Sequence, residues 1–458
     1  MKQQEHHSSV TAPSPSSNPS WRSEPEIDSE RQKFLTACLA NPPDIQRGVY
    51  PFNDVKLTRA DVEWLLLTHE GGRGPVDWSD GQQRGRVGLD LRAADLRRVD
   101  LRSLPLARMR SGLTREEWNL TTLEQRAMAG GHLQGANLSD AHLEGAVLQG
   151  THLEGATLRG THLEEANFFR AYLNDAYLRG AHLENAKLRG AHLEGAYLPS
   201  ARLQGADLRN AFFDSASNLE RSILSEEKSG CALLADVHWE SVNLAVVNWS
   251  YIKHLGDEDK ARRREKSHPP GTIREKARLL EDYHEAVRAY RQLANAMRAQ
   301  GMNEEAIPFA YRAQKLERAV LWRQARWGRV EVDVSQARRQ KGWWEHLRNA
   351  RWRTLKFGSW LFSCFLDLLA GYGHRPGRSL LIYLLTILSF TVCYLVLGRL
   401  TPLEALIFSV TAFHGRGFFP GPFTLGAPVT ALAALEAVMG IFIEISFIAT
   451  FTQRFFGR

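Results

Sequence analysis

Residues 131–213 read GHLQGANLSDAHLEGAVLQGTHLEGATLRGTHLEEANFFRAYLNDAYLRGAHLENAKLRGAHLEGAYLPSARLQGADLRNAFF, a run with a strict period of five. Every fifth position from Leu133 to Phe213 is Leu or Phe, and from Leu138 onward the residue two places before it is Ala or Thr. A helix repeats every 3.6 residues and a strand every two, so neither explains the pattern. We therefore predict a square coil in which each five-residue side turns one large and one small apolar residue inward.

The pattern resembles the pentapeptide-repeat family, whose A-(D/N)-L-x-x units wind a right-handed quadrilateral β-helix with four units per coil. The resemblance implies that each coil adds about 4.8 Å if the coils stack at strand spacing. The period also appears outside the central run, at Leu91, Leu96, Leu101, Leu234, Trp239, Leu244 and Trp249. We therefore predict a β-helix over residues 89–250, interrupted at 102–130 by a segment of helical character. Such a stack is a scaffold, and its fold alone names no chemistry.

Histidines precede many of the inward Leu residues. At 20 residues per coil they would form two columns on opposite faces, one of His132, His152 and His192 and one of His142, His162 and His182. Three interpretations stay open: a solvated face left by repeat duplication, a metal ladder, and a column that repels itself when protonated near the ordinary histidine pKa of about 6.5. The spacing gives no convergent ligand geometry, so we expect no metal and no cofactor.

The N-terminal part differs in composition from the repeats. Residues 1–30 are rich in Ser, Pro and charged side chains, and we predict that they are disordered because they have too few apolar groups to compensate for chain ordering. They also lack the basic start and apolar core of a signal peptide. We expect residues 31–88 to form a small helical region.

Residues 271–330 change to a helical period. The first apolar stripe ends before Gly301 and consists of Leu279, Tyr283, Ala286, Tyr290, Leu293 and Met297. A second stripe lies beyond Gly301. This arrangement predicts an antiparallel helical hairpin, which we interpret as a packing adaptor between the repeats and the C-terminal apolar segments.

The segment ahead of the C-terminal apolar stretches is basic. Residues 251–378 hold 27 Lys and Arg against 15 Asp and Glu, within a chain of formal net charge +7. The excess stops where the apolar stretches begin, and basic residues beside a membrane are attracted to anionic lipid. We therefore expect membrane lipids as partners, and no nucleic acid. Residues 341–370 are predicted to form an amphipathic interfacial helix, whose apolar stripe runs from Phe357 to Leu369 and leaves Asp367 off it.

Two long apolar stretches, Ser379–Gly398 and Val429–Phe451, are expected to cross a membrane as helices. Basic residues flank them on one side, at Arg375, Arg378, Arg454 and Arg458. Such residues mark the cytoplasmic side. Both termini are therefore predicted to be cytoplasmic, at a cell membrane that the chain crosses twice.

The loop between the two stretches indicates what the module does. Thr401 and Pro402 can start a short helix that ends near Phe413, and the sequence HGRGFFPGPF comes directly after it. Irregular backbone at membrane depth is tolerated only where protein or a water-filled cavity satisfies it. A span, a re-entrant half-helix, an irregular loop and a second span are the layout of a pore.

Residues 371–458 resemble the bacterial two-transmembrane channels of the potassium-channel superfamily. The resemblance rests on GYGHRPGR before the first span, on FSVTAF at the end of the short helix, and on E-x-x-x-G in the last helix, at Glu436 and Gly440. It implies a homotetramer, with Gly440 where the family's inner helices bend to gate.

The filter departs from the family. In place of TVGYG the chain has His414, Gly415, Arg416, Gly417, Phe418 and Phe419, so we assign no ion. Arg416 has two interpretations: a ring of four charges that favours anions or blocks cations, or a brace to Glu436 or Glu404. Carboxylates within a span are functional hypotheses by default. Glu436 is either such a group or a brace of the loop, and Glu444 is a candidate lining of a cation-attracting vestibule.

Together these patterns predict a tetrameric membrane ion channel, gated or anchored through its repeat domain. Its expected partners are lipids, permeating ions and an unknown cytosolic protein or ligand at the β-helix. The alternative is a membrane-anchored interaction scaffold with a non-conducting, pore-like module. We find no G-x-S-x-G, P-loop or H-E-x-x-H motif, and we expect no enzymatic activity.

Overall fold

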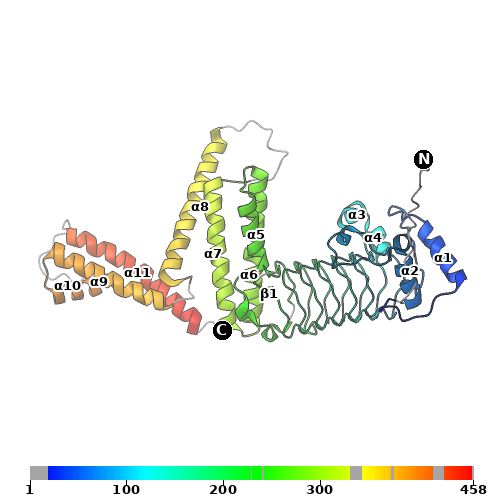
Figure 1. Cartoon of the computed structure of the whole chain (residues 1–458). Coiled ribbons are helices and arrows are strands. Elements are labelled where there is room, and N and C mark those ends of the chain that lie inside the picture. Colours follow the sequence, from blue (N-terminus) through cyan, green and yellow to red (C-terminus); the bar gives the residue numbers. More distant parts are fainter. Residues whose placement is uncertain are drawn as a thin grey trace, which may run out of the picture. The chain divides into compact units, whose positions relative to one another are not determined.

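The computed structural model describes residues 19–227, 230–239, 242–330, 343–372, 376–415 and 428–455. The chain divides into two compact units, Met1–Ile252 and Lys253–Arg458. A stack of coils dominates the first unit, and the second is helical (Figure 1).

Two helices precede the coils, α1 (Ser29–Ala40) and α2 (Arg59–Gly72), with a short 3-10 helix, η1 (Gln83–Gly85), after them. Thr58 caps α2 through a capping box with Asp61. The Arg31 guanidinium of α1 donates to the buried Asp61 carboxylate from two nitrogens, each at 2.9 Å. Such a bidentate pair fixes the angle between the two helices as well as their distance.

The coils have four sides. Parallel single-residue bridges join positions 20 apart in the central run, in four columns that include His132↔His152, Asn137↔Thr157, His142↔His162 and Val147↔Asn167. Backbone hydrogen bonds accompany each bridge, as from Leu133 N to the His152 oxygen at 2.8 Å. The inward residues are closed off from solvent, with Ala176 at 0% and Leu178 at 1% exposure. The predicted quadrilateral coil with its alternating large and small interior is confirmed.

The corners explain why glycine recurs at the end of the repeats. Every fifth residue from Gly135 to Asn210 has a positive φ, such as 62° at Gly145 and 70° at Gly195. A side chain in this left-handed region crowds the following carbonyl oxygen, and glycine has none. Where the corner is not glycine it is often Asp or Asn, as at Asp140 and Asn185, which tolerate this conformation better than most residues.

The first part of the coil extends further along the chain than the sequence suggested. Bridges at Pro105↔His142 and Arg110↔Val147 show that the predicted interruption at 102–130 begins too early. Leu104 and Met109 occupy the small interior position there, both at 0% exposure, and these larger side chains hide the repeat. The true interruption holds two short helices, α3 (Arg115–Leu120) and α4 (Leu123–Ala129).

Aromatic side chains mark the downstream end of the stack. A two-residue hairpin of β1 (Ser225–Glu226) and β2 (Gly230–Cys231) lengthens one coil, after which Phe212 still bridges His238. The Phe213 and Trp239 rings stack at 5.7 Å. Two 3-10 helices come next, η2 (Leu244–Val246) and η3 (Trp249–Tyr251), and Trp249 is buried. Bulky rings thus cover the last coil's interior.

The second unit begins with three helices, α5 (Gly256–Ser267), α6 (Ile273–Ala299) and α7 (Asn303–Trp327). The last two form the predicted hairpin, turning at Gly301 with φ of 79°. Glu258 of α5 is fully buried and accepts from Tyr290 at 2.8 Å and Arg312 at 2.5 Å. Burial alone would raise the pKa of Glu258, but these hydrogen bonds outweigh it and hold that pKa below its ordinary value.

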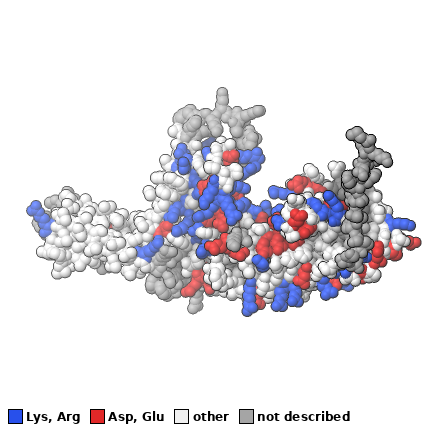
Figure 2. Space-filling view, viewed as in Figure 1, with Lys and Arg blue, Asp and Glu red and all other residues white. Residues whose placement is uncertain are grey.

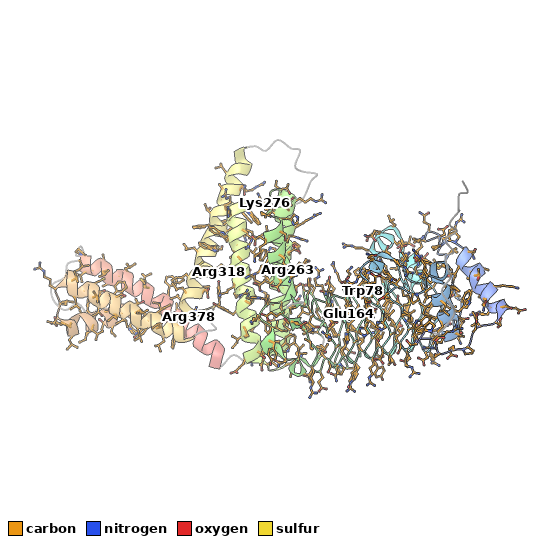
Figure 3. The ribbon with its side chains drawn as sticks, viewed as in Figure 1. Trp78, Glu164, Arg263, Lys276, Arg318 and Arg378 are labelled. Carbon is orange, nitrogen blue, oxygen red and sulfur yellow. The ribbon has the colours of Figure 1, made fainter. Side chains whose placement is uncertain are left out.

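Helix α8 (Trp343–Ala370) packs along α7 (Figure 3). The Trp322 and Trp360 rings lie 4.9 Å apart, and Asp367 accepts from Tyr311 at 2.9 Å and from Arg318 at 2.7 Å. The polar residue that interrupts the apolar pattern of α8 therefore faces α7. Several large apolar side chains of α8 stay exposed, including Leu361, Phe362 and Leu368.

The last three helices are α9 (Pro376–Gly398), α10 (Pro402–Phe413) and α11 (Pro428–Phe455). Segments Gly377–Gly398 and Pro428–Ile448 are long and apolar enough to cross a membrane, with mean hydropathies of 2.5 and 2.0. Only 22% of the apolar window in each segment is buried within the chain. Charged side chains are sparse over them and crowd α5 to α7 (Figure 2).

Candidate functional site

The short helix α10 is seated between the two long apolar helices. Thr401 and Glu404 form a capping box at its start, and Pro402 occupies its first turn, where the missing N–H costs nothing. Its apolar side joins one buried cluster with α9 and α11: Phe390, Tyr394, Ala405, Phe408, Ala412, Val429 and Ala433. The predicted order of span, half-helix and span is therefore one packed body.

Glu436 connects all three helices. Its side chain lies on α11 at 0% exposure. Ser409 Oγ of α10 lies 2.5 Å from Glu436 Oε1, and the Tyr394 hydroxyl of α9 donates to Glu436 Oε2 at 2.7 Å. Among the described residues no Lys, Arg or His pairs with this carboxylate. Glu436 therefore joins α10 to α9 and α11, and both interpretations of its role stay predictions.

Gly440 lies where the end of α10 meets α11. A Cβ atom at this position would collide with the Phe413 carbonyl oxygen. The helix α11 runs through Gly440 without a break. The glycine thus allows a close approach of two backbones, and its predicted role as the bending point of a gate stays a prediction.

His414 and Glu444 face one another at the end of α10. His414 Nε2 lies 3.3 Å from Glu444 Oε1, and His414 Nδ1 lies 2.8 Å from the Val410 oxygen. Gly415 turns the chain with φ of 67°. Arg416, Gly417, Phe418 and Phe419 lie outside the described residues, so both interpretations of Arg416 stay predictions.

Sequence reasoning missed Tyr394 and Ser409, the partners of Glu436. The signal was present, because a carboxylate within an apolar helix needs hydrogen-bond donors and these two residues carry hydroxyl groups on neighbouring apolar helices. The sequence does not specify how each helix is rotated about its own axis, and this rotation decides which hydroxyl groups face Glu436.

The histidine columns form the second candidate site, on the first unit. The bridges put His132, His152 and His192 in one column and His142, His162 and His182 in another, as the spacing predicted. Tyr172, Phe212 and His238 complete the first column, and its rings stack from coil to coil at 4.4–5.4 Å.

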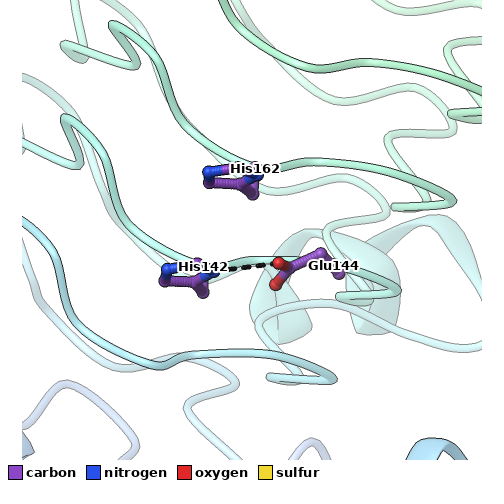
Figure 4. A group of neighbouring side chains, drawn as sticks. All are labelled: His142, Glu144 and His162. Carbon is purple, nitrogen blue, oxygen red and sulfur yellow. Dashed lines mark hydrogen bonds and ion pairs between the residues drawn. The ribbon is translucent and has the colours of Figure 1, made fainter. Parts of the chain in front are cut away.

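A carboxylate two residues further on accompanies most of these histidines. His142 Nδ1 lies 2.9 Å from Glu144 Oε1, and His162 is the next ring in that column (Figure 4). This hydrogen bond raises the pKa of His142 above its ordinary value. Burial instead lowers the pKa of His132, which has Gln134 in place of the carboxylate.

Comparison with known proteins agrees with the coil geometry. The family model described as "Pentapeptide repeats (8 copies)" matches residues 136–175 and 176–214. A search of curated proteins found no match.

Solved structures of pentapeptide-repeat proteins are also similar. Rfr23 from the cyanobacterium Cyanothece 51142 is 31% identical, over 31% of this chain and 91% of that one, with a TM-score of 0.21. HetL from Nostoc sp. strain PCC 7120, involved in heterocyst differentiation regulation, is 18% identical over 40% and 79%, with a TM-score of 0.19. The plasmid-mediated fluoroquinolone resistance protein QnrB1 is 17% identical over 39% and 85%, with a TM-score of 0.20.

The assignment rests on the family model and on the coils themselves. Both put the repeats in the first unit, and members of this family fold as right-handed β-helices. The chain is a pentapeptide-repeat protein with two helices long and apolar enough to span a membrane.

Proposed function

We propose that this chain is one subunit of a homotetrameric ion channel in the cell membrane, with the repeat domain in the cytosol. The observation that carries the proposal is the seating of α10, which the buried Glu436 holds between two apolar helices through Ser409 and Tyr394. A membrane anchor does not require a short helix held between two long ones, whereas a pore does.

The apolar exposure of the module supports assembly around an axis. Exposed large side chains on α9 and α11 suit contact with lipid, but the backbone beyond α10 needs polar partners or water. Neighbouring subunits around a central, water-filled passage would supply both the polar partners and the water. The carbonyl groups at the end of α10 carry a partial negative charge there, next to His414.

The expected topology derives from the basic flanks. Arg378 lies in the first turn of α9, just ahead of the uncharged run Ser379–Gly398, and Arg454 lies beyond the end of the second apolar segment. Basic residues at these ends favour a cytoplasmic location for both chain ends. The repeat domain, any partner it binds and the basic helices α5 to α7 then share the cytosol with anionic lipid headgroups. Pulling on α8 from that side would act on the pore through contacts such as Phe365 with Phe442.

Reversal potentials in planar bilayers test the proposal. The protein should run as a tetramer and conduct in asymmetric salt. If Arg416 forms a charged ring, Arg416→Gln should move the reversal potential toward that of cations while current persists, because a unit charge about 4 Å from an ion contributes around 4 kcal/mol at an effective dielectric of 20. The exposed Arg399, between α9 and α10, provides a matched control as Arg399→Gln.

The outcomes separate the alternatives. Loss of both current and tetramer in Arg416→Gln would make this residue a brace. A chain that is monomeric in detergent and carries no current would overturn the channel and favour a membrane-anchored scaffold with a non-conducting module.

A further inference from the structure

One glutamate in the histidine columns lies between two imidazole rings. Glu164 Oε1 is 3.4 Å from His162 Nδ1 and 3.5 Å from His182 Nδ1. The three donor atoms lie within 4.8 Å of one another. The two histidines belong to successive coils, joined by a bridge, so each holds its position through the backbone ladder.

The 3.4 Å contact of His162 with Glu164 is a long hydrogen bond, and the 3.5 Å contact with His182 is longer still. A good N–H···O bond is about 2.7–3.2 Å long, as in the pair of His142 with Glu144 at 2.9 Å. Donor atoms around a tetrahedral zinc ion, each about 2.0–2.1 Å from the metal, lie about 3.3–3.4 Å from one another. The distances from Glu164 Oε1 to the two imidazole nitrogens, 3.4 and 3.5 Å, are close to this spacing between zinc ligands.

The orientation of the rings points the same way. His142 and His162 stack nearly parallel, at 4° and 4.7 Å, which keeps their nitrogens a stacking distance apart. The planes of His162 and His182 are instead tilted by 50°. A tilt lets two imidazole lone pairs converge on one point, whereas parallel rings cannot.

Glu164 also has an unused oxygen. Its Oε2 atom is buried and has no hydrogen-bond partner among the described residues. The same holds for Glu154, which therefore provides a comparison. Glu154 pairs with His152 at 2.9 Å, but the next ring in its column is Tyr172, so no second imidazole reaches it. The second imidazole distinguishes Glu164 from Glu154.

We propose that His162, Glu164 and His182 bind one divalent ion of the zinc class, with two imidazole nitrogens and one carboxylate oxygen as ligands. Such a donor set suits zinc, and three protein ligands leave a fourth position for water or an external ligand. The neighbouring carboxylates are engaged elsewhere, since Glu184 pairs with Arg202 at 2.7 Å and Glu144 with His142. The ion would connect two coils on the outside of the β-helix.

The sequence alone predicted no metal here. A spacing of 20 residues places rings above one another, but it shows neither the tilt between two of them nor which carboxylate lies between. Glu184 turns to Arg202 in the next coil, and this leaves His182 with Glu164. The site depends on these side-chain directions.

Metal titration of the full chain in detergent tests the proposal. The chain is first treated with a chelator, and His6 and His7 are changed to Gln throughout to remove another pair of histidines. Zn²⁺ titrated by calorimetry should bind at one site per subunit, and Co²⁺ should give the visible bands of tetrahedral coordination. His182→Gln and Glu164→Gln should weaken binding about 100-fold or more, beyond the 10–100-fold typical of a lost outer-shell partner.

The matched controls lie in the other column. His192→Gln and Glu154→Gln remove a histidine and a carboxylate of similar setting and should leave the Zn²⁺ affinity unchanged. His142→Gln should also retain binding, since His142 belongs to the neighbouring group of His142, Glu144 and His162.

Three results would overturn the assignment. The first is a chelator-treated wild-type chain that binds neither Zn²⁺ nor Co²⁺ at this column, which needs no variant to fold. The second is an equal loss of affinity in the His192→Gln control. The third is loss in His142→Gln with none in His182→Gln, which would move the ion to the neighbouring group.

Discussion

At the scale of single residues, Glu436 shows how an apolar module accommodates a carboxylate. A charged group within a span costs a few kcal/mol. Two hydroxyl groups from different helices reach its two oxygens, so the polar atoms satisfy each other and set the position of α10 at the same time. Removing the carboxylate would leave the buried Tyr394 hydroxyl without its acceptor, at about 1–3 kcal/mol, whereas Ser409 Oγ could still donate to the Ile387 oxygen at 3.0 Å.

Two histidines of the repeat domain should respond to pH with opposite sign. The folded state raises the pKa of His142 and lowers that of His132. Protonated His142 therefore stabilises the fold below its ordinary pKa of about 6.5, and this contribution is lost as the pH rises through the folded value. Protonation of His132 costs stability below about the same pH, because the unfolded state holds that proton more tightly.

Thermal unfolding of the repeat domain at about pH 5.5 and about pH 8.5 measures this difference. His142→Gln should lower the midpoint more at the acidic pH than at the basic one. His132→Gln should raise it at the acidic pH and leave it unchanged at the basic one. The same sign of change in both variants would contradict the assignment of partners.

At the scale of elements, α10 and α11 approach one another closely at Gly440. The close approach at Gly440 lets the Phe413 backbone lie directly against α11, and Phe413 is buried. Packed backbones of this kind shift as discrete bodies and do not deform smoothly. Movement of α11 would therefore carry the end of α10, and His414 with it.

A methyl group at this junction should disturb it. Gly440→Ala introduces a Cβ that meets the Phe413 oxygen, so we expect a loss of about 1–3 kcal/mol from overpacking. The thermal midpoint in detergent and the tetramer fraction would report it. Gly358→Ala, on α8, is the matched control because a Cβ there meets nothing within 4 Å; it should be neutral or stabilising by up to about 1 kcal/mol. Equal losses in both variants would contradict the close contact.

The elements also differ in how far the sequence could predict them. The coil was predictable because a large apolar residue recurs at every fifth position. All of these residues can be buried together only if each five-residue unit forms one side of a regular coil. The first residues of the predicted interruption, up to Arg110, were not recognised as coil because Leu104 and Met109 replace alanine. Helix α5 was missed for another reason: polar contacts such as those of Glu258 with Arg312 and Lys260 with Asp282 hold it in place, and charged pairs leave no apolar period.

The candidate site was predictable in outline only. The half-helix and the importance of Glu436 could be inferred from the sequence, since polar atoms in apolar helices are rare and require an explanation. The partners of Glu436 and the contact of Gly440 with Phe413 depend on how the helices rotate and approach. The pairing of Glu164 with two histidines likewise depends on rotamers, which a repeat pattern does not specify.

At the scale of the whole molecule, the chain joins two units with different surfaces. The first buries its own core of Leu, Phe and Ala, and the second exposes apolar side chains on α9 and α11. If the second unit lies in a membrane as proposed, we expect that it alone requires detergent.

Truncation tests this division. A chain that ends at Ile252 should be soluble without detergent and should unfold cooperatively, because its interior positions are closed off by its own coils. A chain that lacks residues 371–458 should also be soluble and should no longer form tetramers. Size-exclusion chromatography with light scattering measures both. Aggregation of only the longer chain would show that the exposed apolar side of α8 itself needs lipid.

The ladder between coils has a mechanical consequence. Its hydrogen bonds, such as that from Leu143 N to the His162 oxygen, join each coil to the next. A force that separates neighbouring coils would therefore load one interface at a time, and the stack would peel open in steps. Each step frees about 20 residues, or roughly 70 Å of extended chain. An ion bound by His162 and His182 would join two successive coils and so resist the opening of one of these interfaces.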